Sequence, residues 1–133
     1  MTFDAEAAIA CNDTKSTQWS DDSFIGLLHE RHQWNAEAYF RFEAALYELC
    51  DMRMTDVVLR KFVDRVAARV FGYTMLMFSC HFDSCDGFRI QNLNDDELRT
   101  WQQRFQCVLE GFFSNSLPGA GTLQPLNRFI ATP

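Results

Sequence analysis

Cysteine and histidine, two residue types that often bind metal ions, lie close together at Cys80, His81 and Cys85. A further cysteine, Cys107, could supply a fourth ligand. Structural zinc sites usually bring their ligands in two close pairs, such as C-x2-C, whereas the spacing here is irregular. The sequence therefore favours packed thiols beside a turn, and we expect no cofactor and no metal ligands.

The three histidines, His29, His32 and His81, could also take part in metal or acid–base chemistry. A di-iron helical bundle needs Glu-x-x-His pairs or more histidines than three, and the sequence has neither. Phosphate-binding loops, dinucleotide fingerprints, nucleophile elbows and H-E-x-x-H are missing as well. We expect that the protein is not an enzyme and has no catalytic residues, and we keep a metal-binding helical bundle as an alternative.

The charge of the chain is acidic, with 18 Asp and Glu against 12 Lys and Arg and a net charge of −6. The basic residues gather between Arg53 and Arg69, while acidic residues dominate the N-terminal third and the stretch from Asp83 to Glu97. An acidic surface repels phosphate backbones and attracts basic partners. We therefore expect a protein partner with a basic surface and no direct nucleic-acid binding.

A group of acidic side chains can imitate a row of phosphates and occupy a basic cleft. The candidate contacts to such a partner are Glu43, Glu48, Asp51, Asp95 and Asp96. These features predict a small protein-binding inhibitor of the immunity-protein, antitoxin or phage-encoded anti-CRISPR type. Its target would be a toxin, nuclease or defence complex whose nucleic-acid-binding or catalytic cleft it covers. An acidic secretion chaperone or adaptor is the alternative, and a monomer and a homodimer are both compatible with the sequence.

The expected location is the cytoplasm of the producing cell or of a host. No apolar run reaches the ~18 residues that a membrane helix needs. The N-terminus is acidic and lacks the basic segment and the apolar core of a signal peptide. The five cysteines are odd in number and scattered, which favours reduced thiols. We therefore expect no contact with a membrane.

Helical periodicity is found in four segments, at roughly 22–33, 36–52, 55–80 and 95–114. The last segment begins with Asn94 and Glu97 at the spacing of a capping box. This pattern predicts an all-α fold, a compact bundle of about four helices in a single domain over residues 1–133. Residues 1–19 are expected to be a flexible lead-in, and residues 117–133 an irregular tail that is strapped onto the core through Leu126, Phe129 and Ile130.

The segment 55–80 is the longest of the four, with Thr55 as its expected cap. Its predicted core stripe is Leu59, Phe62, Val66, Val70, Tyr73 and Met77. From Tyr73 onward the polar face disappears, so we expect this end to be buried on most sides. Gly72 could end the helix, in which case residues 73–91 would form a small hairpin in an α+β fold. Because Met75, Leu76 and Met77 are poor strand formers, the helix is favoured.

Overall fold

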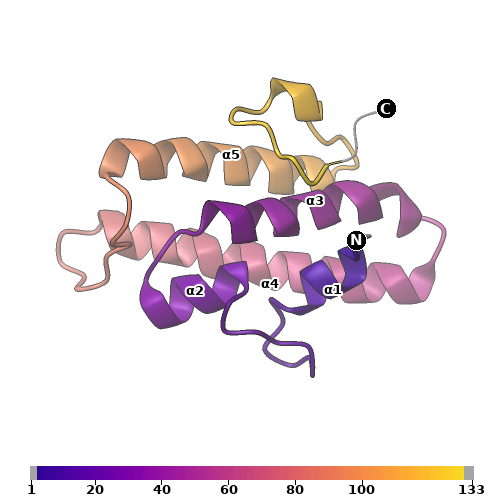
Figure 1. Cartoon of the computed structure of the whole chain (residues 1–133), viewed down its shortest axis with the longest axis horizontal. Helices are drawn as coiled ribbons and strands as arrows, with labels where there is room; N and C mark the ends of the chain where they lie inside the picture. Colours follow the sequence, from indigo (N-terminus) through magenta and orange to yellow (C-terminus); the bar gives the residue numbers. More distant parts are fainter. Residues whose placement is uncertain (1–2, 131–133) are drawn as a thin grey trace.

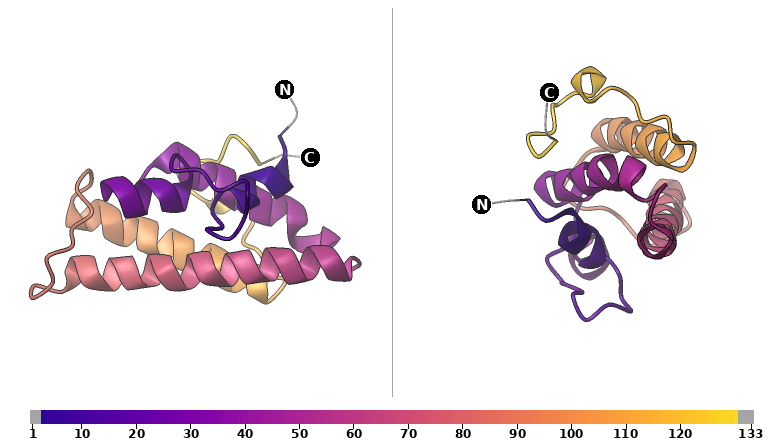
Figure 2. Two further views of the ribbon diagram at one scale, coloured as in Figure 1. Left: turned by 90° about the horizontal axis from the view of Figure 1, so that it is seen from below. Right: turned by 90° about the vertical axis from the view of Figure 1, so that its right-hand side faces the viewer.

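The structure is a computed structural model that describes residues 3–130, and over that range it contains helices and loops and no strand. The elements are α1 (Ala5–Ala10), α2 (Phe24–Arg31), α3 (Ala36–Met52), α4 (Val57–Phe82), α5 (Asp95–Phe113) and the 3-10 helix η1 (Ala120–Thr122). Among the three long helices, α3 and α5 run in the same direction and α4 runs antiparallel to both, and α1 and α2 lie on the side of α3 that is remote from α5 (Figures 1 and 2). The predicted all-α bundle is confirmed.

Each α-helix begins after a residue whose side-chain oxygen accepts a backbone N–H of the first turn, as helix N-caps do. These caps are Asp4, Ser23, Asn35, Asp56 and Asn94. The capping box of α5 is present as predicted, with Glu97 N–H donating to Asn94 at 2.8 Å and Asn94 N–H donating to Glu97 at 3.1 Å. Helix α4 is capped by Asp56 and not by Thr55.

The first two helical segments are separate helices because the chain reverses at His32. This residue ends α2 with a left-handed backbone, φ 53°, and Asn35 then caps α3. The loop between α4 and α5 packs on this linker. Gln91 N–H donates to His32 O at 2.8 Å, and Asn92 exchanges hydrogen bonds with the backbone of Trp34 at 2.9 and 2.8 Å.

Helix α4 is continuous through Gly72, so the alternative hairpin at 73–91 is not formed. A Cβ placed at Gly72 would meet no atom within 4 Å, which means that this glycine does not mark a close helix contact. The chain turns after α4, where Asp83 accepts the N–H of Cys85 at 2.9 Å and Asp86 accepts the N–H of Phe88 at 2.7 Å.

The buried face of α4 differs in part from the predicted stripe. Its buried residues are Leu59, Val63, Val66, Ala67, Val70, Thr74, Phe78 and His81. Phe62, Tyr73 and Met77 are only half-buried, and Leu76 is 55% exposed. The expectation that the end from Tyr73 is buried on most sides is therefore wrong, because other helices cover only one face of α4.

The centre of the core is an aromatic cluster around Trp34, which is 2% exposed. The rings of Phe24, Tyr39, Phe78, Trp101 and Phe105 all lie within 6.4 Å of it, centroid to centroid. This cluster joins α2, the α2–α3 linker, α3, α4 and α5.

The predicted flexible lead-in at 1–19 is wrong for the residues that the structure describes, while Met1 and Thr2 lie outside them. Helix α1 buries Ala5, Ile9 and Ala10 in contact with α3 and α4. After it, Asn12 accepts the N–H of Ile25 at 3.0 Å, and the buried Asp13 pairs with Arg65 at 2.9 Å. Residues 3–19 are thus part of the packed structure.

The tail is irregular as predicted, apart from η1. Phe129 is half-buried, and the Arg41 guanidinium lies 4.5 Å from its ring centroid. Leu126 is 59% exposed and does not attach the tail; the buried residue is Asn127, which donates to Phe40 O at 2.8 Å. Residues 131–133 lie outside the described range.

Candidate functional site

Glu43 does not lie on the surface, so its prediction as a partner contact is wrong. Its carboxylate is fully buried on α3 and accepts two hydrogen bonds from Arg104, at 2.9 and 2.8 Å. It also accepts from Tyr39 at 3.0 Å and from Asn127 at 2.9 Å. Glu43 follows Tyr39 by four residues and precedes Leu46 by three, and this position inside an apolar stripe is the signal that could have shown its burial.

Asp95 and Asp96 are exposed but lie at the end of the bundle opposite to Glu48 and Asp51. They occupy the first turn of α5, whose 19 residues span about 28 Å. Glu48 and Asp51 lie near the C-terminal end of α3, at the end of the bundle where α5 finishes (Figure 1). The four exposed candidate contacts therefore form two separate pairs and not one patch.

His81, the histidine of the possible zinc group, uses both ring nitrogens within the protein. Its Nδ1 accepts the N–H of Ile90 at 3.0 Å. The proton is therefore on Nε2, which donates to Asp95 at 2.8 Å. Among residues 3–130 no three side chains of His, Cys, Asp or Glu are grouped to hold a metal ion, so the geometry gives the metal-binding alternative no support.

The Glu48–Asp51 end carries a hollow of about 440 Å³ between the start of α1 and the C-terminal half of α3. Its apolar lining consists of Phe3, Ala5, Leu49 and Met52, and its charged lining of Asp4, Glu6 and Glu48. All three carboxylate residues are exposed to solvent. Among the described residues that line this acidic hollow there is no basic one, so its charge is uniformly negative.

An exposed apolar patch lies beside the acidic hollow, at the turn from α3 to α4. Met52, Met54, Val57 and Val58 form this corner patch, with exposed fractions of 50, 45, 56 and 81%. Met52 belongs to both features, and the acidic residues Asp51 and Asp56 are exposed beside the patch. Clustered apolar side chains with a polar rim are typical of protein-binding surfaces.

The turn that carries the corner patch is held in place by Arg53, which is only 3% exposed. Its guanidinium donates to Phe112 O at 2.8 Å, to Asn115 Oδ1 at 2.9 Å and to Asp64 Oδ1 at 2.7 Å. These contacts join the α3–α4 turn to the C-terminal end of α5. The backbone that carries the corner patch is therefore preformed, which lowers the entropy cost of binding through it.

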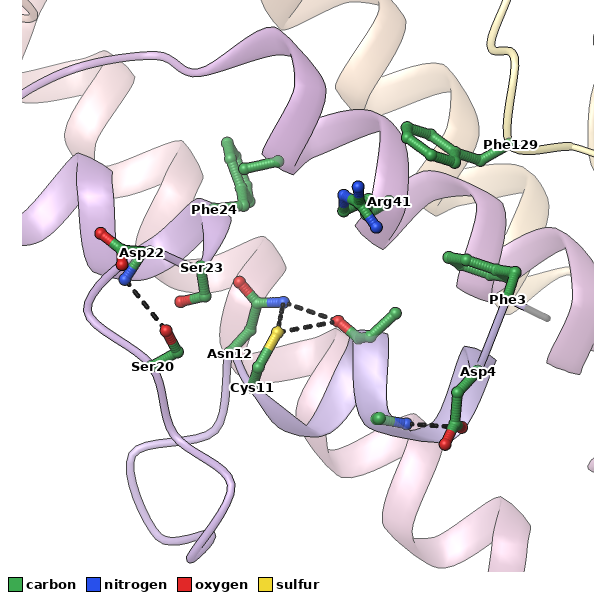
Figure 3. A pocket seen from close by; sticks show the side chains of 13 residues that line it. Phe3, Asp4, Cys11, Asn12, Ser20, Asp22, Ser23, Phe24, Arg41 and Phe129 are labelled. Carbon is green, nitrogen blue, oxygen red and sulfur yellow. Dashed lines mark hydrogen bonds between the residues drawn. The ribbon is translucent and has the colours of Figure 1, made fainter. Parts of the chain in front are cut away.

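A groove of about 530 Å³ lies on the other side of α1 and shares Phe3 and Asp4 with the acidic hollow (Figure 3). Phe3 and Phe129 stack at 6.1 Å at one end of it, and Arg41 lies against Phe129. Cys11 lines the groove and donates to Ala8 O at 3.2 Å. Burial raises the pKa of the Cys11 thiol, so this cysteine does not have the properties of an activated nucleophile.

Comparison of the chain with protein-family models, with curated proteins and with solved structures finds no match. Within residues 3–130 none of the helices is both long enough and apolar enough to cross a bilayer.

Proposed function

We propose that this protein binds another protein and inhibits it by covering a basic cleft, and that it does so with the acidic hollow and the corner patch. The single observation that carries this proposal is the adjacency of the two features, three carboxylates on an apolar floor next to four exposed apolar side chains. Lys and Arg side chains of a partner can lay their stems on Phe3 and Met52 and place their charges beside Glu48.

The two features would contribute differently to binding. The carboxylates steer a basic partner and raise the association rate, an effect that weakens as salt is added. The corner patch supplies the apolar contact area that slows dissociation, and Met52 and Met54 are flexible enough to fit an irregular surface. A nucleic-acid-binding or catalytic cleft of a toxin, nuclease or defence complex has the basic chemistry that this surface fits.

The proposal assigns the protein no catalytic step and no direct contact with nucleic acid or a membrane, and it places the protein in the cytoplasm of the producing cell or of a host. One part of the surface is less favourable to a basic partner. Arg60 and Lys61 follow the corner patch by one turn along α4. The partner's cations are therefore expected on the α1 and α3 side of the patch, where Asp4, Glu6 and Glu48 lie.

The test is capture of partners from native lysate with the wild-type protein and with Glu48→Lys, followed by binding measurements with the purified partner. Asp96→Lys is the matched control, because it makes the same charge change at the other end of the bundle. We expect Glu48→Lys to weaken binding about ten-fold or more, and the affinity of the wild-type protein to fall as salt is raised.

Inhibition of the partner's own activity, lost with Glu48→Lys and kept with Asp96→Lys, would complete the support. The proposal is wrong if both variants bind like the wild type, if Asp96→Lys alone loses binding, or if the captured partner contacts a different face.

A further inference from the structure

A second pocket lies on α4 away from the acidic hollow, where the α1–α2 loop and α2 meet the middle of that helix. Its volume is about 230 Å³. Ile25, Val66 and Val70 give it an apolar floor, and Trp19 and Tyr73 are its large aromatic side chains. Sites for drug-sized ligands measure ~300–1,000 Å³, so a ligand of this pocket has one or two rings.

Hydrogen bonds hold the aromatic side chains of this pocket in place. The indole N–H of Trp19 donates to Asp21 Oδ1 at 3.0 Å. The hydroxyl of Tyr73 lies 2.9 Å from Nδ1 of His29, and their rings pack edge to face with centroids 5.9 Å apart. The aromatic surface is therefore already ordered before a ligand arrives, which favours stacking of a planar ring.

Two arginines and three acidic residues lie around the pocket: Arg65 and Arg69 face Asp13, Asp21 accepts the indole N–H of Trp19, and Glu30 lies near Tyr73. Asp13, with a side chain that is 1% exposed, faces two arginines. The Arg65 side chain donates to it at 2.9 Å, whereas the Arg69 guanidinium lies 4.0 Å from it and makes no hydrogen bond within residues 3–130. Because one carboxylate is shared by two guanidinium groups, Arg69 keeps N–H donors for a second anion.

We propose that this pocket binds a small aromatic carboxylate, with its ring against Trp19 and Tyr73 and its carboxylate on the guanidinium of Arg69. The apolar floor takes the ring, and the planar fork of Arg69 matches the two oxygens of a carboxylate. Burial, with Glu30 nearby, raises the pKa of Tyr73, so its hydroxyl stays protonated at neutral pH and adds no negative charge beside the ligand. This site is separate from the acidic hollow and the corner patch, and it needs no protein partner.

The experiment is titration of the full chain with indole-3-acetate, followed by backbone amide NMR and calorimetry. Indole-3-acetamide is the neutral matched probe. We expect indole-3-acetate to bind with a submillimolar dissociation constant and to shift the amide signals around Trp19, His29 and Arg69. The dissociation constant of the acetamide should be at least about ten-fold higher, because the acetamide lacks the charge that Arg69 pairs with.

Arg69→Gln should lose binding about ten-fold or more, and Arg60→Gln, on the same helix but outside the pocket, should keep it. The amide spectrum of each variant also shows whether it is folded. Equal binding of the acid and the amide, unchanged binding by Arg69→Gln, signal shifts elsewhere on the protein, or no binding of indole-3-acetate would each overturn the proposal. None of these results bears on the protein-binding proposal.

Discussion

The buried carboxylate of Glu43 accepts hydrogen bonds from three parts of the chain. Tyr39 donates from α3, Arg104 from α5 and Asn127 from the tail. Burial and the charge of Glu43 raise the pKa of Tyr39 well above its ordinary value, so the hydroxyl remains a donor. A fully satisfied buried network of this kind fixes how segments meet more than it adds net stability.

Replacing Glu43 by alanine should destabilise the protein strongly, because Arg104 would be left buried without its counter-charge. The expected loss in free energy of unfolding is about 3–5 kcal/mol. Glu48→Ala, on the exposed side of the same helix, should change it by less than about 0.5 kcal/mol. Urea unfolding followed by circular dichroism measures both, and a similar small effect of the two substitutions would contradict the buried network.

Two helical glycines, Gly72 and Gly26, differ in the space that an added side chain would have. At Gly72 in α4 an added Cβ meets nothing within 4 Å. At Gly26 in α2 it would lie 2.5 Å from Ser20 O and 2.6 Å from the backbone of Asp21. The absence of a side chain at Gly26 lets the preceding loop cross directly over α2, whereas Gly72 has no such reason for being glycine.

Gly72→Ala should therefore stabilise the protein by about 0.5–1 kcal/mol, since alanine has the higher helix propensity. Gly26→Ala should destabilise it by about 1–3 kcal/mol, because a backbone segment must move. Thermal unfolding of both variants provides the comparison. A loss of stability in Gly72→Ala would mean that α4 is covered by another surface at this point.

At the scale of the whole molecule, α3 joins the N-terminal helices to α5, and α4 packs on α5 and α1. Helix α3 contacts α1, α2 and α5, and both ends of the described chain meet beside it, where Phe3 stacks on Phe129 (Figure 3). Asn127 attaches the tail by donating to Phe40 O and to Glu43. We therefore expect the tail to unfold together with the helices.

Asn127→Ala should lower the free energy of unfolding by about 1–3 kcal/mol, because Phe40 O and one oxygen of Glu43 lose a donor. Leu126→Ala, at the neighbouring exposed position, should change it by less than about 0.5 kcal/mol. Denaturant titrations of the two variants test this, and equal stability would show that the tail does not belong to the folding unit.

The four main helices could be predicted because their signals are local. Periodicity and N-cap residues lie within a few positions of one another, as Asn94 and Glu97 do in α5. Helix α1 could not be predicted from its own residues, since six residues do not form a stable helix alone. It exists because Ile9 and its neighbours pack on the bundle.

The candidate site could be predicted only in part, because it too depends on how distant segments pack. Glu48 and Asp51 lie at the proposed surface, but the hollow around Glu48 is created by α1, whose packing the sequence did not reveal. The burial of Glu43 is indicated only by its place in the apolar stripe of α3, because its counter-charge, Arg104, is 61 residues away along the chain. Ion pairs over such distances leave no pattern in a single sequence.

The aromatic cluster around Trp34 gives the protein an internal optical probe. Tyr39 and Trp101 lie 5.3 and 5.6 Å from its ring, within a rigid and asymmetric environment. The near-ultraviolet circular dichroism of this cluster reports fixed side-chain packing, whereas the far-ultraviolet signal reports helix content. A substitution that affects only the surface should leave both spectra unchanged. A substitution that loosens the packing between the helices should abolish the near-ultraviolet signal and keep the far-ultraviolet signal.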